Sequence, residues 1–264
     1  MTIKLLELPQ DNNSSFMAGP ALGPRRIREA LVSDSANMFT ETGLDLGQPE
    51  IWQDAGDVVL ADLAGKQAFD VIHARVSGLL TEGHRVLSLG GDNSVAWPVI
   101  AAHCEAHQGL NILHVDAHPD LYANMLDNPY SHASPFARLM EGGLVKRLVQ
   151  VGIRTLNAHQ HEQAERYGVE IHEMRDLSGV DAITFDGPVY CSVDLDALDP
   201  AFAPGVSHFE PGGLSTREVL RLIQTFEGAL VGADVVELNP HRDPYGMTAM
   251  AAAKIAKELI ACLH

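Results

Sequence analysis

Residues 111–120 read Asn111-Ile112-Leu113-His114-Val115-Asp116-Ala117-His118-Pro119-Asp120, a short and mostly apolar run followed at once by acidic and imidazole side chains. Such a run predicts a buried β-strand. Side chains two residues apart on a strand point to the same face, so Asp116, His118 and Asp120 would begin on one side of its carboxyl end. The stretch therefore predicts both a strand of the core and a polar cluster where that strand ends.

A second stretch repeats this arrangement far downstream. Residues 188–193 are mostly apolar, and Asp194-Leu195-Asp196 follows them directly. Asp194 and Asp196 would also share one side of a strand end. Carboxylates gathered around a histidine repel one another unless a cation lies among them, which predicts a hydrolytic site with two metal ions. A turn in the first motif and a solvated strand end in the second form the competing interpretation.

The residue types limit which metals such a site would bind. Carboxylate and imidazole ligands without a thiolate suit Mn²⁺, and also Zn²⁺, Ni²⁺, Co²⁺ or Fe²⁺. Two such ions lower the pKa of a water molecule and hold it against a planar carbon. His114 lies inside the strand and is expected to be packed there rather than to be a ligand.

Strand-like runs alternate with helix-like patterns along the whole chain. This alternation predicts an α/β fold of three layers, α/β/α, with a mostly parallel central sheet. Polar groups that serve function then gather at the carboxyl ends of the strands. No linker or low-complexity tract interrupts residues 1–264, so one domain is expected. Strands are predicted at 5–8, 86–89, 111–115, 149–153, 169–172, 189–193 and 230–236, and helices at 24–32, 61–80, 95–107, 134–140, 160–167, 215–226 and 248–263.

The composition excludes several classes of partner. The 264 residues carry a net charge of −17, which argues against nucleic-acid binding. An acidic chain suits a cationic substrate or a metal, but many proteins are acidic without binding either, and this explains the charge equally well. The three cysteines show no CxxC spacing, so no disulfide framework is expected. The start of the chain lacks a signal-peptide stretch and no window is apolar enough to cross a membrane, so a cytoplasmic enzyme is expected.

The motifs also occur together with other blocks in a recognisable order. In combination they resemble the ureohydrolase family, which includes the arginases and agmatinases. The resemblance covers about residues 85–255 and implies an arginase-like fold, two Mn²⁺ ions, and hydrolysis of a small cationic guanidino compound to urea and an amine. The matching blocks are Gly90-Gly91-Asp92-Asn93-Ser94, Asp116 to Asp120, Ser131-His132-Ala133-Ser134-Pro135-Phe136, Ser192 to Pro200, Pro204-Gly205, Pro211-Gly212-Gly213 and Val236-Glu237-Leu238-Asn239-Pro240.

The resemblance also assigns roles to individual residues. Glu237 stands where the family has a glutamate that pairs with the guanidinium, since a planar cation is held best by two parallel hydrogen bonds. His132 stands where many members have a histidine that carries a proton to the leaving amine. Asp196 is implied to share in the proton handling. For the metals, the resemblance implies Asp116, Asp120, Asp194 and position 93 around one ion, and Asp116, His118, Asp194 and Asp196 around the other.

Position 93 departs from the family pattern, which reads Gly-Gly-Asp-His-Ser with the histidine as a ligand. Asn93 offers a neutral amide oxygen, a weaker donor to Mn²⁺ than imidazole. The first metal site is therefore expected to be weakly filled. Three explanations stay open: a natural enzyme that tolerates the amide or works with one metal, a variant engineered to weaken the site, or a degenerate member acting as a catalytically silent subunit.

The substrate is predicted from two further departures. Arginases carry an Asn two residues beyond the last ligand of the first motif, and this chain has Tyr122 there. The stretch 155–159, which includes Asn157 as a candidate substrate contact, lacks the acidic residues that reach the α-amino group in arginases. These features favour the agmatinase-like branch, with agmatine or a related guanidino compound as substrate and arginine as the alternative. The resemblance implies a homotrimer or homohexamer.

Overall fold

Apolar runs of the sequence form the inner strands of one parallel sheet. The computed structural model describes residues 2–264, so Met1 lies outside the described part. There, the sheet has eight strands in the order β2-β1-β3-β8-β7-β4-β5-β6, and every neighbouring pair is parallel. The strands are β1 (Ile3–Leu8), β2 (Trp52–Asp57), β3 (Arg85–Gly90), β4 (Asn111–Val115), β5 (Arg147–Ile153), β6 (Glu170–Glu173), β7 (Thr184–Asp194) and β8 (Glu227–Val236).

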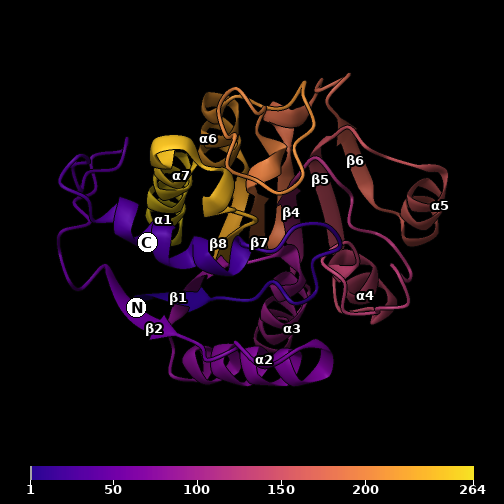
Figure 1. Ribbon diagram of the computed structural model, residues 1–264, viewed down its shortest axis with the longest axis horizontal. Coiled ribbons are helices and arrows are strands. Elements are labelled where there is room, and N and C mark those ends of the chain that lie inside the picture. Colours follow the sequence, from indigo (N-terminus) through magenta and orange to yellow (C-terminus); the bar gives the residue numbers. More distant parts are fainter. Residues whose placement is uncertain (1) are drawn as a thin grey trace.

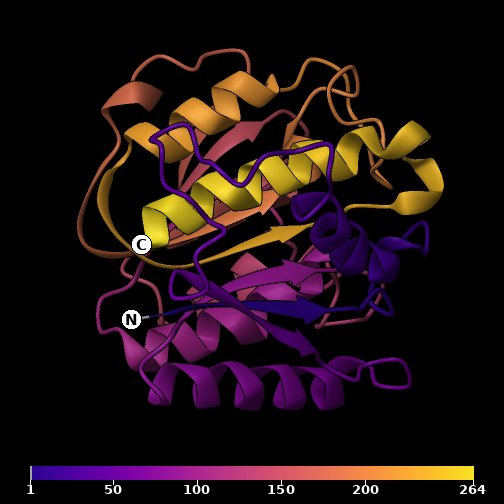
Figure 2. The same cartoon turned by 90° about the vertical axis from the view of Figure 1, so that its left-hand side faces the viewer.

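Helices cover both faces of this sheet, which confirms the predicted three-layer α/β/α fold (Figure 1, Figure 2). α1, α6 and α7 pack on one face, and α2, α3, α4 and α5 contribute to the core on the other. No helix within residues 2–264 has both the length and the apolar character needed to cross a membrane. The helices are α1 (Gly23–Leu31), α2 (Gly65–Thr81), α3 (Ala96–Ala106), α4 (Pro135–Glu141), α5 (Ala158–Tyr167), α6 (Thr216–Thr225) and α7 (Met247–Leu263).

One strand and several element starts differ from the sequence prediction, among them β7, which begins at Thr184 rather than at 189, and β8, which begins at Glu227 rather than at 230. β2 was not predicted, because Trp52–Asp57 is largely polar and exposed and shows no apolar alternation. It forms at the edge of the sheet, where its pairing with β1 supplies the order that its side chains do not. α2 begins at Gly65 rather than at position 61, since residues 61–62 form a turn.

The centre of the sheet determines where the polar motifs meet. β3, β8, β7 and β4 are consecutive neighbours, and each is followed by one of the motifs singled out in the sequence. Because all four strands are parallel, their carboxyl ends lie at the same edge. The topology therefore gathers segments that begin near residues 91, 116, 194 and 237.

Candidate metal centre and cavity

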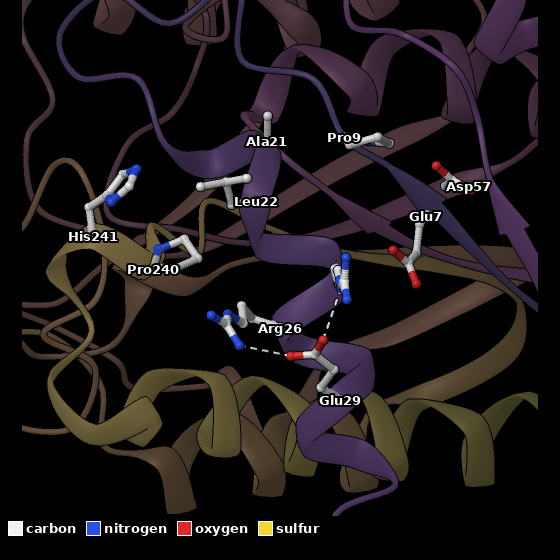
Figure 3. A pocket seen from close by; sticks show the side chains of 10 residues that line it. Glu7, Pro9, Ala21, Leu22, Arg26, Glu29, Asp57, Pro240 and His241 are labelled. Atoms are coloured by element: carbon white, nitrogen blue, oxygen red, sulfur yellow. Dashed lines mark hydrogen bonds and ion pairs between the residues drawn. The ribbon is translucent and has the colours of Figure 1, made fainter.

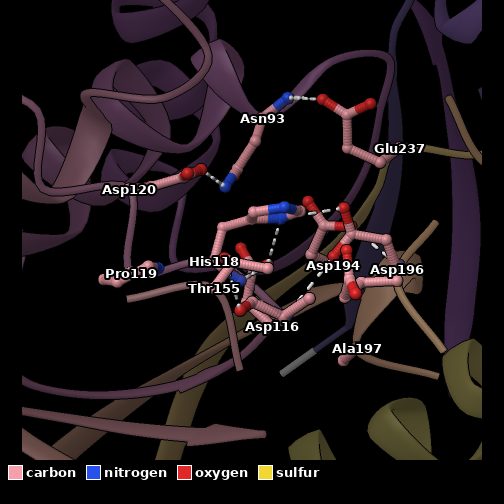
Figure 4. A network of polar contacts seen from close by, with 12 residues as sticks. Asn93, Asp116, His118, Pro119, Asp120, Thr155, Asp194, Asp196, Ala197 and Glu237 are labelled. Atoms are coloured by element: carbon pink, nitrogen blue, oxygen red, sulfur yellow. Dashed lines mark hydrogen bonds and ion pairs between the residues drawn. The ribbon is translucent and has the colours of Figure 1, made fainter. Parts of the chain in front are cut away.

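The ends of β3, β4 and β7 place six acidic, amide and imidazole side chains around one point, and the end of β8 places Glu237 beside them (Figure 4). Two of these residues have left-handed backbones, with φ of 50° at Asp120 and 68° at Glu237. A non-glycine residue held there stores strain, and such strain concentrates at functional sites. The members of the cluster are Asn93, Asp116, His118, Asp120, Asp194 and Asp196, with Glu237 beside them.

Asp116, His118 and Asp196 form the tightest group. In the described part of the chain, they are the acidic and imidazole residues whose potential ligand atoms all lie within 4.8 Å of one another. His118 Nδ1 lies 3.1 Å from Asp196 Oδ2 and 3.4 Å from Asp116 Oδ1. The backbone N–H of His118 donates to Asp116 Oδ1 at 2.6 Å. These residues offer two carboxylate oxygens and one imidazole nitrogen, a set of ligands that suits a divalent cation.

Asp194 and Asp120 lie near this group (Figure 4). Asp194 Oδ1 accepts the backbone N–H of Asp196 at 2.9 Å, which fixes the turn after β7. Asp120 Oδ2 accepts a hydrogen bond from Asn93 Nδ2 at 2.7 Å. Asn93 Oδ1 is buried and has no hydrogen-bonding partner within residues 2–264. The amide of Asn93 thus holds Asp120 through its nitrogen, and its oxygen stays free to act as a metal ligand.

The carboxylates repel one another strongly. Burial and the charge of Asp196 raise the pKa of Asp116 to about 8, and burial and the charge of Asp116 raise the pKa of Asp120 to about 7. Burial and Asp196 also raise the pKa of Asp194 well above its usual range. Burial opposes ionisation of Asp196 as well, but the adjacent His118 charge outweighs it and lowers the pKa of that carboxyl.

His118 balances only part of this negative charge. Burial lowers its pKa, but the charge of Asp196 and the hydrogen bond to Asp116 raise that pKa to about 12. With only the protein's own charges present, the other carboxyl groups therefore hold protons near neutral pH. The charge of a divalent cation would displace these protons. This charge deficit and the unused oxygen of Asn93 fit a metal centre.

Glu237 and His132 form an ion pair next to the cluster. His132 Nδ1 lies 3.2 Å from Glu237 Oε1, and the same oxygen accepts the backbone N–H of Asn93 at 2.9 Å. Burial disfavours the charged form of His132, but the hydrogen bond and charge of Glu237 raise its pKa to about 9. Both residues are buried. The pair thus holds a proton next to a carboxylate at neutral pH.

An N-terminal loop completes this side of the site through Ser15, which the sequence analysis missed. Ser15 Oγ lies 2.9 Å from His132 Nε2. The loop is held by Asp92, whose Oδ2 accepts from Asn13 N and Ser14 Oγ. A side chain at Gly91 would lie 1.9 Å from a backbone oxygen of this loop, so only glycine permits the approach. The more than 100 residues between Ser15 and His132 concealed the contact.

A cavity of about 190 Å³ opens onto the cluster. Asn157 does not line it: it caps α5 by accepting Gln160 N–H, and its Nδ2 donates to Tyr122 Oη at 2.6 Å. Its proposed contact with substrate would therefore act through Tyr122. The cavity is lined by Ser15, His118, Asp120, Tyr122, Met125, His132, Ala133, Thr155, Gln160, Asp194, Asp196, His208 and Glu237.

A larger cavity, of about 560 Å³, lies beside α1 and the ends of β1 and β2 (Figure 3). Its two exposed arginines, Arg25 and Arg26, are both paired with Glu29 at 2.9 Å. Its other carboxylates are Glu7 and Asp57, and Glu7 contacts Arg28. The charges of this cavity largely balance one another, unlike those of the acidic cluster.

Comparisons with known proteins agree with this geometry. Residues 1–262 match the family described as the arginase family. "Arginase, mitochondrial" of Medicago truncatula is 48% identical over 98% of this chain and 81% of its own length. The structure of arginase from Medicago truncatula superposes with a TM-score of 0.95 at 46% identity, covering 99% of this chain and 87% of that one. "Agmatinase" of Bacillus anthracis is 33% identical over 96% of this chain and 89% of its own length.

These relatives correct one expectation outright. A cytoplasmic location is contradicted, because plant arginases at 46–48% identity carry mitochondrial or chloroplastic in their names. The expectation rested on the lack of an apolar secretory stretch, which bears on secretion and on no other destination. The preference for the agmatinase-like branch also lacks support, since the plant arginases match this chain more closely than the agmatinase does.

Proposed function

The chain belongs to the arginase family, and from this membership we propose that it hydrolyses the guanidino group of L-arginine to urea and L-ornithine. The observation that carries the substrate assignment is the difference in identity: 45–48% to plant arginases against 32–33% to agmatinases, over nearly the whole chain in both cases. Members of the family hydrolyse guanidino compounds with two metal ions, typically Mn²⁺. We propose that the whole chain forms one domain and assembles as a homotrimer or homohexamer.

The metal ligands proposed here are the residues that the sequence pattern named. Asp116, His118, Asp194 and Asp196 would hold one ion, and Asp116, Asp120, Asp194 and Asn93 the other. Such a pair, when bound, acts as a Lewis acid and lowers the pKa of a water molecule toward neutrality. Mn²⁺ is the proposed metal, and Ni²⁺, Co²⁺ or Zn²⁺ would suit the same ligands.

Glu237 is proposed to orient the substrate. Its carboxylate lines the cavity, carries negative charge next to the cluster, and is held by the backbone of Asn93. A guanidinium placed against it would donate two parallel hydrogen bonds, which fix the plane of the target carbon. Glu237 has a left-handed backbone, and its side chain reaches toward Asn93 (Figure 4).

His132 is proposed to supply the proton to the leaving amine. The raised pKa of His132, about 9, keeps the ring protonated at neutral pH. Nδ1 faces Glu237, and Nε2 faces Ser15 at the cavity wall. A protonated ring there can donate to nitrogen as the bond from carbon to the leaving amine breaks. Asp196, paired with His118 on the opposite side, is the proposed acceptor for a proton of the water.

Agmatine is the second candidate because of the charges at the cavity. Among the described residues that line it, no Lys or Arg is present to pair with an α-carboxylate, and each of its carboxylates belongs to the cluster or is Glu237. Tyr122 stands at this wall and is bonded to Asn157 rather than free. Agmatine has no α-carboxylate and would therefore need no cationic partner at this wall.

Urea release from L-arginine, agmatine, 4-guanidinobutyrate and 3-guanidinopropionate separates these candidates. The assay is run with Mn²⁺, Ni²⁺, Co²⁺ or Zn²⁺, and Asp196→Asn serves as the control for contaminating activity. We expect the highest kcat/KM with L-arginine. Agmatine as best substrate would overturn the assignment, and no urea from any substrate with any metal would support the catalytically silent subunit instead.

A further inference from the structure

A row of polar side chains crosses the sheet one layer below the metal cluster. Register places Ser88, Asp234, Ser192, His114 and Gln150 opposite one another on β3, β8, β7, β4 and β5. All five are fully buried. Buried polar groups in the middle of a sheet are costly unless they serve one another or a neighbouring site.

His114 joins this row to the metal cluster. It lies two residues before Asp116 and points to the same face of β4. Its Nε2 lies 2.9 Å from Asp116 Oδ2, and both atoms are buried without a hydrogen-bonding partner within residues 2–264. The ring is held in place by Phe136, with the ring centroids 3.8 Å apart. A packed strand histidine thus faces one oxygen of a proposed bridging carboxylate.

Gln150 determines which ring nitrogen of His114 carries the proton. Gln150 Nε2 lies 2.7 Å from the carbonyl oxygen of Pro119, which can only accept, so the atom facing it must be the amide nitrogen. The same nitrogen lies 3.0 Å from His114 Nδ1. Its second hydrogen therefore points at Nδ1, which must be the acceptor. The proton of the neutral ring then sits on Nε2, opposite Asp116.

Among residues 2–264, Asp116 Oδ2 is an unpaired acceptor that faces this proton. Asp234 Oδ1 accepts from Ser192 Oγ at 2.7 Å, and Asp234 Oδ2 accepts from Tyr190 Oη at 2.8 Å. Both oxygens of the nearby carboxylate are thus already engaged. Asp116 uses its other oxygen, Oδ1, for the backbone of His118.

We propose that His114 is a positioning residue, whose Nε2–H holds Asp116 Oδ2 and so sets the rotation of this carboxylate toward the metals. Gln150 acts through His114, and its second contact, to Pro119, ties the same unit to the loop that carries His118 and Asp120. Groups that orient ligands in this way typically change metal affinity by about 10- to 100-fold when they are removed. The inference rests on the proposed function, since it assumes that Asp116 binds metal.

The test compares Mn²⁺ affinity between variants, measured by thermal-shift titration of chelator-treated protein with MnCl₂. His114→Leu removes the donor, and His114→Gln keeps an N–H near the position of Nε2. We expect His114→Leu to weaken Mn²⁺ binding about 10- to 100-fold and His114→Gln to restore most of it. Gln150→Leu should weaken binding in the unaltered background and have little further effect in His114→Leu.

His103→Leu is the matched control. His103 is also fully buried, but its Nδ1 bonds the carbonyl of Val99 within α3 and its ring packs on Tyr190. This variant should lower thermal stability without changing Mn²⁺ affinity. Equal affinity in His114→Leu and the unaltered chain, or an equal loss in His103→Leu, would overturn the inference alone. Failure of the unaltered chain to bind Mn²⁺ would overturn the proposed metal site along with it.

Discussion

Asn93→His tests whether the amide at position 93 weakens one half of the proposed metal centre. Asn93 is 1% exposed, and its Nδ2 donates to Asp120 Oδ2 at 2.7 Å. That hydrogen bond occupies a carboxylate oxygen which a cation would need. The imidazole of a histidine would remove the competing amide hydrogen and offer a nitrogen ligand in its place.

The size of the effect follows from this hydrogen bond. A hydrogen bond to a charged group contributes about 1.5–3 kcal/mol, which corresponds to roughly 10- to 100-fold in affinity at about 1.4 kcal/mol per factor of ten. Part of this energy is lost when Asp120 turns toward an ion. We therefore expect the more weakly bound Mn²⁺ of the unaltered chain to bind at least roughly tenfold more tightly in Asn93→His.

The assay is metal content by mass spectrometry after dialysis against buffered Mn²⁺ concentrations, with urea release followed on the same samples. We expect one tight and one weak equivalent in the unaltered chain and two tight equivalents in Asn93→His. Asn124→His, at an exposed position, controls for metal bound by an added imidazole. Two tight equivalents in the unaltered chain, or no gain in Asn93→His, would refute the reasoning.

Three further predictions concern the remaining groups. Glu237→Gln keeps the size of the side chain but removes the charge that faces a guanidinium. The transition state with arginine should therefore lose about 2–5 kcal/mol of stabilisation, which appears as a fall in kcat/KM. An unchanged kcat/KM in steady-state urea release would refute this role of Glu237. The folded-state pKa of His132 is raised from 6.5 to about 9, so its pair with Glu237 stabilises the fold fully below about pH 6.5 and loses this effect as pH rises through about 9. Chemical unfolding at pH 6 and pH 9.5 should show this dependence in the unaltered chain, and His132→Asn should not share it. At a free metal concentration of 100 times Kd, bound metal contributes about 2.7 kcal/mol to the free energy of unfolding, so its removal by a chelator should lower Tm by about 5–10 °C. Equal Tm values in thermal scans with and without EDTA would contradict a bound metal.

The fold was largely predictable because its inner strands are buried on both faces. Runs such as residues 111–115 and 189–193 are mostly apolar and buried along their length, which marks strands of a parallel sheet. β2 was not predictable by the same rule. Its partner β1 and its position at the sheet edge decide its conformation, and neither is encoded in the local pattern.

The site was predictable as a set of residues but not as a set of contacts. Spacing of two residues placed Asp116 with His118, and Asp194 with Asp196, because alternation along a strand is a local property. The contact between Ser15 and His132 depends on a loop that passes Gly91, and the row through His114 depends on the register of five strands. Such relations arise from tertiary structure, so no local signal in the sequence announces them.

The two halves of the proposed metal centre differ in what a cation must displace. On the His118 side it is a proton, since Asp196 and Asp116 raise the pKa of that ring to about 12, and a rise in pH makes its removal easier. On the other side it is an amide hydrogen of Asn93, which no accessible pH removes. A rise in pH through about 7 ionises Asp120, but ionisation also strengthens the hydrogen bond from Asn93 to it. A change of pH therefore favours metal binding mainly on the His118 side, and only a change of residue 93 removes the competition on the other.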